Sequence, residues 1–217
     1  MSTTSFIIHV YDDVEPIDVG ATFGVLSMAK RIDAGIDMAV VARTAGNVRL
    51  ANGLEIVARY GLKDAPNGDV LMILGGATWP EMSKDEPTLE FIRSFGARGT
   101  VASVCTGALI LAGSGVLDGK TATTRRFAPR GVDTPLDLMT KHHPSVRTTE
   151  ARYVDEGKIV TGGGVVLAVD TTLHLISRFR GKDVAAETAR IIEYAWSPDG
   201  GAFSDVPSGS GRHVAHS

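Results

Sequence analysis

The 217-residue sequence contains a single cysteine, Cys105, so no disulfide can form within it. An unpaired thiol is typical of a reducing compartment, and we expect a cytoplasmic protein. The sequence also lacks any apolar run long enough to span a bilayer. Its first residues, MSTTSFIIHVYDD, lack the basic region of a secretion signal and indicate a first strand. We therefore expect no association with a membrane.

The sequence has no large excess of either charge. The formal net charge is −3, and the local group of Arg125, Arg126 and Arg130 is too small to form a broad basic surface. A nucleic-acid partner is therefore not expected, because binding to phosphates usually needs a concentrated basic surface. The spacing of His, Cys and acidic residues does not suggest a zinc site, and we expect neither a metal nor a cofactor.

Short β-branched and apolar runs alternate with helical patterns along the chain. This alternation predicts an α/β fold in which helices cover both faces of a mainly parallel sheet. The predicted strands are Phe6–Val10, Met38–Arg43, Leu54–Ala58, Val70–Leu74, Val101–Val104, Thr121–Thr124, Arg152–Val154 and Lys158–Thr161. The predicted helices are Val19–Ile32, Pro87–Arg98, Thr106–Ser114, Leu136–Lys141, Val165–Arg178 and Val184–Tyr194. We expect one domain over residues 1–196, followed by a flexible tail rich in Gly, Ser and Pro over residues 197–217.

Cys105 directly follows a predicted buried strand and precedes a predicted helix that begins with small residues. This order outlines a nucleophile elbow, in which small neighbours such as Gly107 and Ala108 permit a tight turn. A helix N-terminus at the carboxyl edge of a parallel sheet also favours a thiolate. The alternative is a small buried hydrophobic residue with no chemical role.

Two further features are expected at the same edge of the sheet. Gly75 and Gly76 follow an apolar strand, where their backbone N–H groups could form an oxyanion-type pocket or simply a turn. Asp18 follows the first strand, where its carboxylate could act on the thiol or cap a helix. Three strand ends that meet at one place favour a functional site.

Five segments together resemble the ThiJ/PfpI superfamily over about Ser5 to Tyr194. They are Pro16–Asp18, Ile73–Gly76, Ser103–Gly107, Leu117–Thr124 and Thr161–Val165 with Asp170. The resemblance implies a flavodoxin-like three-layer sandwich, a homodimer, and a reactive Cys105 whose partner acid is Asp18. The segment SVCTGALILAGSGVLDGKTATT is similar to the branch that contains isocyanide hydratases and the sensor domains of some transcription activators.

The sequence departs from the superfamily at Arg125, where many members carry a histidine. A Cys–His pair of the protease or amidase type is therefore not expected from that position. His174 is expected to be a packing or surface residue of its helix, and His142 and His143 are expected to be solvated.

The resemblance implies hydration of isocyanides to N-substituted formamides through a thioimidate on Cys105, with Asp18 as acid and base. Thr106 would help position the acid or the water, and Gly75, Gly76 and Gly107 would form the substrate and oxyanion pocket. Asp170 would steady the turn that carries the cysteine, or be a plain carboxylate on a helix surface.

Two other functions stay open. One is redox or ligand sensing without turnover, and the other is glyoxalase-like or deglycase-like chemistry on α-oxoaldehydes. The partner would be a small molecule in each case. Candidates for an apolar lining are Trp79, Phe127 and Phe203.

Overall fold

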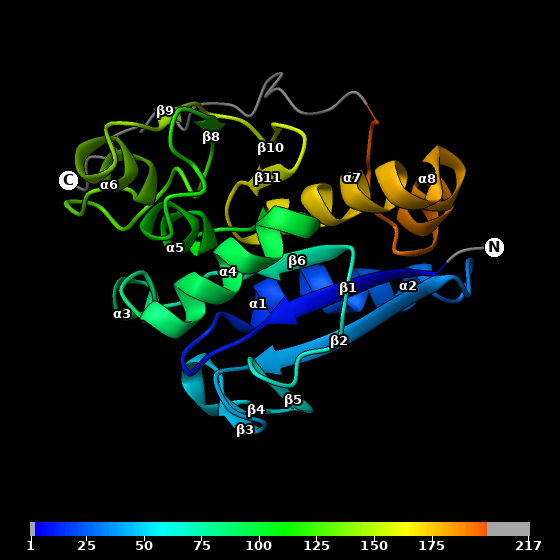
Figure 1. The fold of residues 1–217 in the computed structure, drawn as a ribbon. Helices are drawn as coiled ribbons and strands as arrows, with labels where there is room; N and C mark the ends of the chain where they lie inside the picture. The colour runs from blue at the N-terminus through cyan, green and yellow to red at the C-terminus, as the bar shows by residue number, and fades with distance from the viewer. Residues whose placement is uncertain (1–2, 199–217) are drawn as a thin grey trace, which may run out of the picture.

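Seven strands form the central sheet of the computed structural model, which describes residues 3–198 (Figure 1). Their order across the sheet is β10-β11-β7-β6-β1-β2-β5. The strands are β1 Thr4–His9, β2 Ile36–Ala42, β5 Tyr60–Gly61, β6 Val70–Ile73, β7 Thr100–Ser103, β10 Tyr153–Asp155 and β11 Ile159–Gly162. Neighbouring strands are parallel except β10 and β11, which are antiparallel.

Helices cover both faces of this sheet (Figure 1). The helices are α1 Pro16–Val19, α2 Val25–Ala29, α3 Trp79–Met82, α4 Glu86–Arg98, α5 Gly107–Gly113, α6 Pro135–His142, α7 Ala168–Arg180 and α8 Lys182–Ile191. On one face α2 packs against α7 and α8, and Phe179 of α7 contacts Phe6 of β1 edge to face. On the other face α4 and α5 pack on β6 and β7. The predicted flavodoxin-like α/β sandwich is confirmed.

The two central strands, β6 and β7, require a layer of helices on each face of the sheet. Every residue of β6 and β7 is buried, as expected for parallel strands that face helices on both sides. Their registers align Ile73 with Ser103, and β1 aligns His9 with Ile73. The carboxyl ends of β1, β6 and β7 therefore lie side by side, and the loops that follow them meet at one edge.

Two small sheets lie outside the central one. The hairpin β3 Gly46–Arg49 with β4 Glu55–Ala58 contains the predicted strand at Leu54–Ala58. The predicted strand Thr121–Thr124 is wrong in extent, because only β8 Thr121–Ala122 forms and it pairs with β9 Arg147–Thr148. The short elements β3, β5, β9 and α3 were not predicted, since two to four residues are too few to show a periodicity.

The helix predicted at Val19–Ile32 begins earlier, at Pro16, and is not regular. Between α1 and α2 the residues Gly20–Gly24 form one π-helical segment, η1. A π turn holds one residue more than an α turn. Pro16 stands in the first turn, where its missing N–H costs nothing.

His9, at the end of β1, is a fully buried histidine. Within residues 3–198 neither ring nitrogen has a hydrogen-bond partner. Burial lowers the pKa of His9 to about 4, although the charge of Asp85 opposes the shift. The folded state therefore holds a neutral imidazole at neutral pH.

The predicted tail at residues 197–217 lies outside the described residues from position 199 onward, and so does Phe203. Within the described part of the chain, no helix has the length and apolar character needed to span a membrane.

Candidate active site

Cys105 stands on a strained turn between β7 and α5. Its φ angle is +53°, in the left-handed region that a non-glycine residue enters at a cost of about 1 kcal/mol or more. Two hydrogen bonds hold this conformation: the Cys105 N–H donates to the Gly163 carbonyl at 3.0 Å, and the Thr124 hydroxyl donates to the Cys105 carbonyl at 2.7 Å. The side chain is 3% exposed. The predicted elbow geometry is present, with the thiol at the buried edge of the sheet.

Glycines permit the close approach of neighbouring backbones at this turn. A Cβ atom on Gly107 would lie 2.2 Å from the carbonyl oxygen of Ile73, and one on Gly75 would lie 2.8 Å from the Cβ of Cys105. Both positions therefore need glycine for packing, whatever else they contribute.

Asp18, in the first turn of α1, lies beside the thiol. Its carboxylate is fully buried, and Oδ2 accepts a hydrogen bond from the Gly75 N–H at 2.9 Å. Oδ1 has no partner with hydrogen-bond geometry in residues 3–198. The residue at the N-cap is Glu15, whose side chain makes no capping bond. The alternative role of Asp18 as a helix cap therefore does not match its position.

Burial raises the pKa of Asp18 to about 7, more than the Gly75 N–H lowers it. The nearby Glu15 raises this pKa further, whereas the Cys105 thiol and the Arg125 guanidinium lower it. At neutral pH the carboxyl group therefore stands near the midpoint between its acid and base forms.

Burial likewise raises the pKa of Cys105 to about 12, and the Asp18 charge adds to the shift. The sequence predicted that a helix N-terminus would favour a thiolate. The Thr106 N–H does lower the pKa, as do the Val165 N–H and Arg125, but desolvation outweighs all three. The resting residue is therefore a protonated thiol.

The predicted oxyanion glycines use their N–H groups inside the protein. Gly75 donates to Asp18, Gly76 donates to the Thr106 hydroxyl at 3.0 Å, and Gly107 donates to the Val104 carbonyl at 3.0 Å. The Thr106 hydroxyl in turn donates to the Gly76 carbonyl at 3.3 Å. This pair fixes the loop after β6 to the cysteine turn, which differs from the predicted contact of Thr106 with water or acid.

Val165 was not predicted as a site residue. Its backbone N–H acts on the Cys105 sulfur, and its φ angle is +58°. A β-branched residue rarely adopts this conformation. The identity of residue 165 therefore did not indicate that its backbone N–H would face the thiol. The preceding glycines, Gly163 and Gly164, were part of the recognised motif and mark the loop that presents this donor.

Asp170, in the first turn of α7, is buried and pairs with two side chains. Oδ2 accepts from Arg152 Nη1 at 3.0 Å and from the Tyr194 hydroxyl at 2.8 Å. The Arg152 carbonyl accepts from the Gly163 N–H at 2.8 Å, and Gly163 holds the Cys105 N–H. Asp170 thus reaches the cysteine turn through Arg152 and Gly163, and it is not a plain surface carboxylate.

His174, His142 and His143 contact other parts of the protein. His174 hydrogen-bonds Asp155 at 2.7 Å and stacks on Tyr153, as expected for a packing residue. His142 and His143 line a pocket of about 420 Å³ together with Trp79. Among the described residues, no group of three or more His, Cys, Asp or Glu side chains is placed to hold a metal ion.

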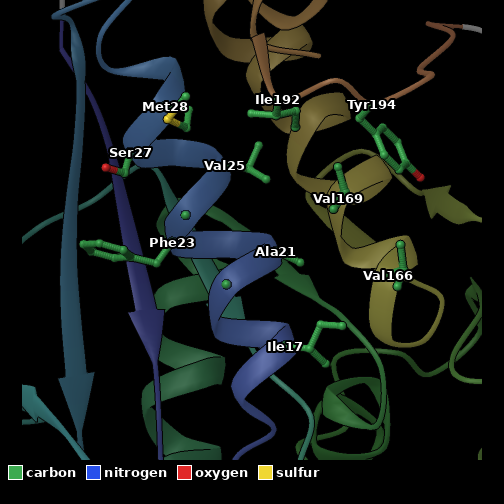
Figure 2. A pocket seen from close by; sticks show the side chains of 12 residues that line it. Ile17, Ala21, Phe23, Val25, Ser27, Met28, Val166, Val169, Ile192 and Tyr194 are labelled. Atoms are coloured by element: carbon green, nitrogen blue, oxygen red, sulfur yellow. The ribbon is translucent and has the colours of Figure 1, made fainter. Parts of the chain in front are cut away.

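An apolar groove of about 660 Å³ runs along the helix that carries Asp18. Figure 2 shows Ile17, Ala21 and Val25 on one side of it and Val169 and Ile192 on the other. Neither Cys105 nor Asp18 lines the groove, although Ile17 is the neighbour of Asp18 in sequence. The groove is therefore a surface next to the site and not the site itself.

A family model described as DJ-1/PfpI matches residues 4–178, a range that contains both Asp18 and Cys105. The chain belongs to the DJ-1/PfpI family. The predicted superfamily is thereby confirmed.

Relatives within the family have different roles. The chain is 30% identical to the isonitrile hydratase of Pseudomonas putida over 92% of its own length and 83% of the relative's. It is 24% identical to the HTH-type transcriptional regulator CdhR of Pseudomonas aeruginosa over 69% of this chain and only 43% of that protein.

Solved structures show the same fold. The crystal structure of a ThiJ/PfpI protein from Pseudomonas syringae matches with a TM-score of 0.77 at 26% identity, covering 92% of this chain and 78% of that one. Drosophila melanogaster DJ-1β matches with a TM-score of 0.76 at 20% identity, covering 89% and 99%.

Proposed function

We propose that this protein hydrates isocyanides to N-substituted formamides, with Cys105 as nucleophile and Asp18 as acid and base. The observation that carries the proposal is the buried Asp18 carboxyl, whose pKa is raised to about 7 by burial beside the thiol on the strained turn. The similarity to an isonitrile hydratase over most of both chains supports the same chemistry.

The first step needs one proton, which the Cys105–Asp18 pair already holds. A thiol with a carboxylate carries one proton in total, and so does a thiolate with a carboxylic acid. Transfer of the proton from Sγ of Cys105 to Asp18 therefore creates the reactive pair without a proton from solvent. The thiolate forms a bond to the terminal isocyanide carbon, and Asp18 donates its proton to that carbon. The product is a thioimidate, Cys–S–CH=N–R, beside an ionised Asp18.

The second step uses the ionised carboxylate as a base. Asp18 takes a proton from water as the hydroxyl oxygen bonds to the thioimidate carbon, and it then passes this proton to the nitrogen. The C–S bond then breaks as the remaining hydroxyl proton passes to Asp18. This step releases the formamide and restores the Cys105 thiolate beside a protonated Asp18. The N–H groups of Thr106 and Val165 stabilise the sulfur anion, because both act on Sγ. One water is consumed and no amine leaves.

The sensor and glyoxalase alternatives receive less support from the site. Redox-sensing cysteines are accessible to the oxidant, whereas Cys105 is 3% exposed. Glyoxalase-like chemistry would lack the histidine that Arg125 replaces.

The test follows formation of N-substituted formamides from a panel of alkyl and aryl isocyanides, with methylglyoxal as a competing substrate class. We expect isocyanide turnover, a covalent adduct on Cys105 by intact mass, and no reaction of methylglyoxal. Undiminished turnover by Cys105→Ala would remove the nucleophile from the mechanism. Absence of isocyanide turnover, together with a stable Cys105 sulfinate after peroxide treatment, would favour the sensor.

We also propose a cytoplasmic homodimer that uses the apolar groove as its contact face. Ile17 and Val166 at the groove are 41% and 52% exposed. A Cβ atom on Gly20 or Gly24, one turn apart, would meet nothing within 4 Å, which leaves room for a second backbone to approach. Light scattering at micromolar concentration should give twice the 22.9 kDa of the chain. Gly24→Arg should weaken the dimer, and a monomeric wild type would exclude it.

A further inference from the structure

Arg125 lies beside the candidate active site without a side-chain partner. Within residues 3–198 its guanidinium makes no ion pair and no hydrogen bond, and Nε is buried. Its charge nevertheless reaches both Asp18 and Cys105, since it lowers the pKa of each. A buried N–H donor without an acceptor is costly, so a bound group that accepts from Nε of Arg125 would remove this cost.

The stem of Arg125 is fixed by the loop that also presents Val165. A Cβ atom on Gly164 would lie 2.4 Å from Cγ and 2.7 Å from Cβ of Arg125. Only glycine at 164 leaves space for the stem, which therefore lies directly over the residue before Val165. The Val165 N–H interacts with the Cys105 sulfur and lowers the pKa of the thiol. The Gly164–Val165 loop therefore contacts both the Arg125 stem and the cysteine.

Arg125 and Val165 both line a pocket of about 480 Å³, whose other walls include Phe127 and Leu167. The pocket therefore adjoins the loop whose Val165 N–H lowers the pKa of the thiol, although Cys105 does not line it, and it combines apolar walls with the cations of Arg125 and Arg126. An N-substituent that passes the Gly164–Val165 loop from Cys105 would reach this pocket.

Arg126 provides an internal comparison, because it stands next in sequence and borders the same pocket. Its guanidinium pairs with Glu150 at 2.9 Å and lies over the Phe127 ring. Its charge is thus already balanced, in contrast to that of Arg125.

We propose that Arg125 is a specificity-determining residue that binds an anionic group, foremost a carboxylate, on the N-substituent of the substrate. The inference rests on the proposed function for the identity of the reacting group, which is an isocyanide. The anion subsite itself rests on Arg125, Gly164 and the pocket. The natural substrate class is then a small isocyanide that carries a carboxylate on its N-substituent.

The first experiment needs no turnover. Iodoacetate and iodoacetamide alkylate a thiolate with loss of iodide and differ in charge, so their rate ratio at Cys105 cancels any change in the thiolate fraction. Relative to 2-mercaptoethanol, we expect the ratio to favour iodoacetate by about tenfold in the wild type. Arg125→Met, which keeps an aliphatic stem, should lose this preference, Arg125→Lys should keep part of it, and Arg126→Gln should keep most of it. Melting temperatures verify that the variants fold.

The second experiment compares isocyanoacetate with its methyl ester. We expect kcat/KM to favour the acid by about tenfold in the wild type and by less than about twofold in Arg125→Met. If the alkylation preference is present and neither isocyanide reacts, the proposed hydratase function fails and the anion subsite stands. If both isocyanides react equally and the alkylation ratio matches that of 2-mercaptoethanol, the hydratase stands and the subsite is overturned.

Discussion

The Asp18 carboxylate accepts a hydrogen bond from the Gly75 N–H at 2.9 Å, across 57 positions of sequence. This bond joins the first turn of α1 to the loop after β6. It occupies Oδ2, while Oδ1 has no partner with hydrogen-bond geometry in the described chain. One oxygen thus anchors the side chain and the other is available for proton transfer.

Asp18→Asn should increase stability while it removes activity. The amide oxygen can still accept from Gly75, but the amide cannot exchange a proton with the substrate, so we expect a loss of about 10²–10⁴-fold in kcat. The pKa of Asp18 is raised to about 7 in the folded state, so the contribution of this carboxyl group to wild-type stability falls as pH rises from about 4 to 7. The Asp18→Asn variant has no carboxyl group to titrate at this position, so it does not lose stability in this way. Its gain in the free energy of unfolding should grow to at most about 4 kcal/mol at pH 8.

Urea unfolding of both proteins at pH 5 and pH 8 measures this gain. A variant that is less stable than the wild type at pH 8 would show that the carboxylate has a structural role in addition to any chemistry.

Cys105→Gly should be more stable than Cys105→Ala. Both variants remove the thiol, but only glycine adopts the φ angle of +53° without strain. We expect a difference of about 1 kcal/mol in the free energy of unfolding, measured by chemical denaturation. Equal stabilities would mean that the turn relaxes once the sulfur is gone.

Thr124→Val should loosen the cysteine turn, whereas Thr124→Ser should not. The Thr124 hydroxyl donates to the Cys105 carbonyl at 2.7 Å and is buried. Valine leaves that carbonyl without this donor, at a cost of about 1–2 kcal/mol, while serine keeps it. Thermal unfolding and the alkylation rate of Cys105 report the two effects, and similar values for valine and serine would contradict the assigned role.

The buried His9 should make the protein sensitive to acid. Its pKa is about 4 in the folded state against about 6.5 when unfolded. The unfolded state therefore binds more protons at this residue between these values, so the contribution of His9 to stability falls as pH decreases from about 6.5 to 4, opposite in sign to the contribution of Asp18 over the same range. His9 contributes up to about 3 kcal/mol to this loss.

His9→Leu should remove this contribution, so the variant should gain stability relative to the wild type as pH falls from about 6.5 to 4. The exposed His142 is the control, because His142→Ala should leave the profile as it is. If the difference in stability between His9→Leu and the wild type is the same at pH 6.5 and pH 4, the imidazole is not neutral in the folded protein.

Much of the architecture follows from local patterns. The apolar runs of β6 and β7 predicted fully buried parallel strands, and small residues after Cys105 predicted the turn. Parallel strands also predicted that Asp18, Gly75 and Cys105 would lie at one edge, since their loops leave the sheet on the same side. The structure places all three together.

Other features depend on distant contacts that no local pattern encodes. The raised pKa of Cys105 comes from burial among several elements and from the Asp18 charge, which overrides the effect of the helix N-terminus. The short extent of β8 depends on its pairing with β9, and the N–H of Val165 reaches the sulfur only because its φ angle is positive. The glycines predicted as free donors are occupied because Asp18 and Thr106 fold back onto them.

The π-helical segment Gly20–Gly24 has a consequence for insertions and deletions in this part of the chain. Its additional residue lies between the turn that carries Asp18 and the buried face of α2. Removal of one residue there would restore a regular α-helix and turn Asp18 by about 100° around the helix axis relative to α2. A deletion that makes the secondary structure more regular would thus carry the carboxyl group away from the sulfur. The number of residues between Pro16 and Ala29 therefore sets the direction of the Asp18 side chain relative to α2.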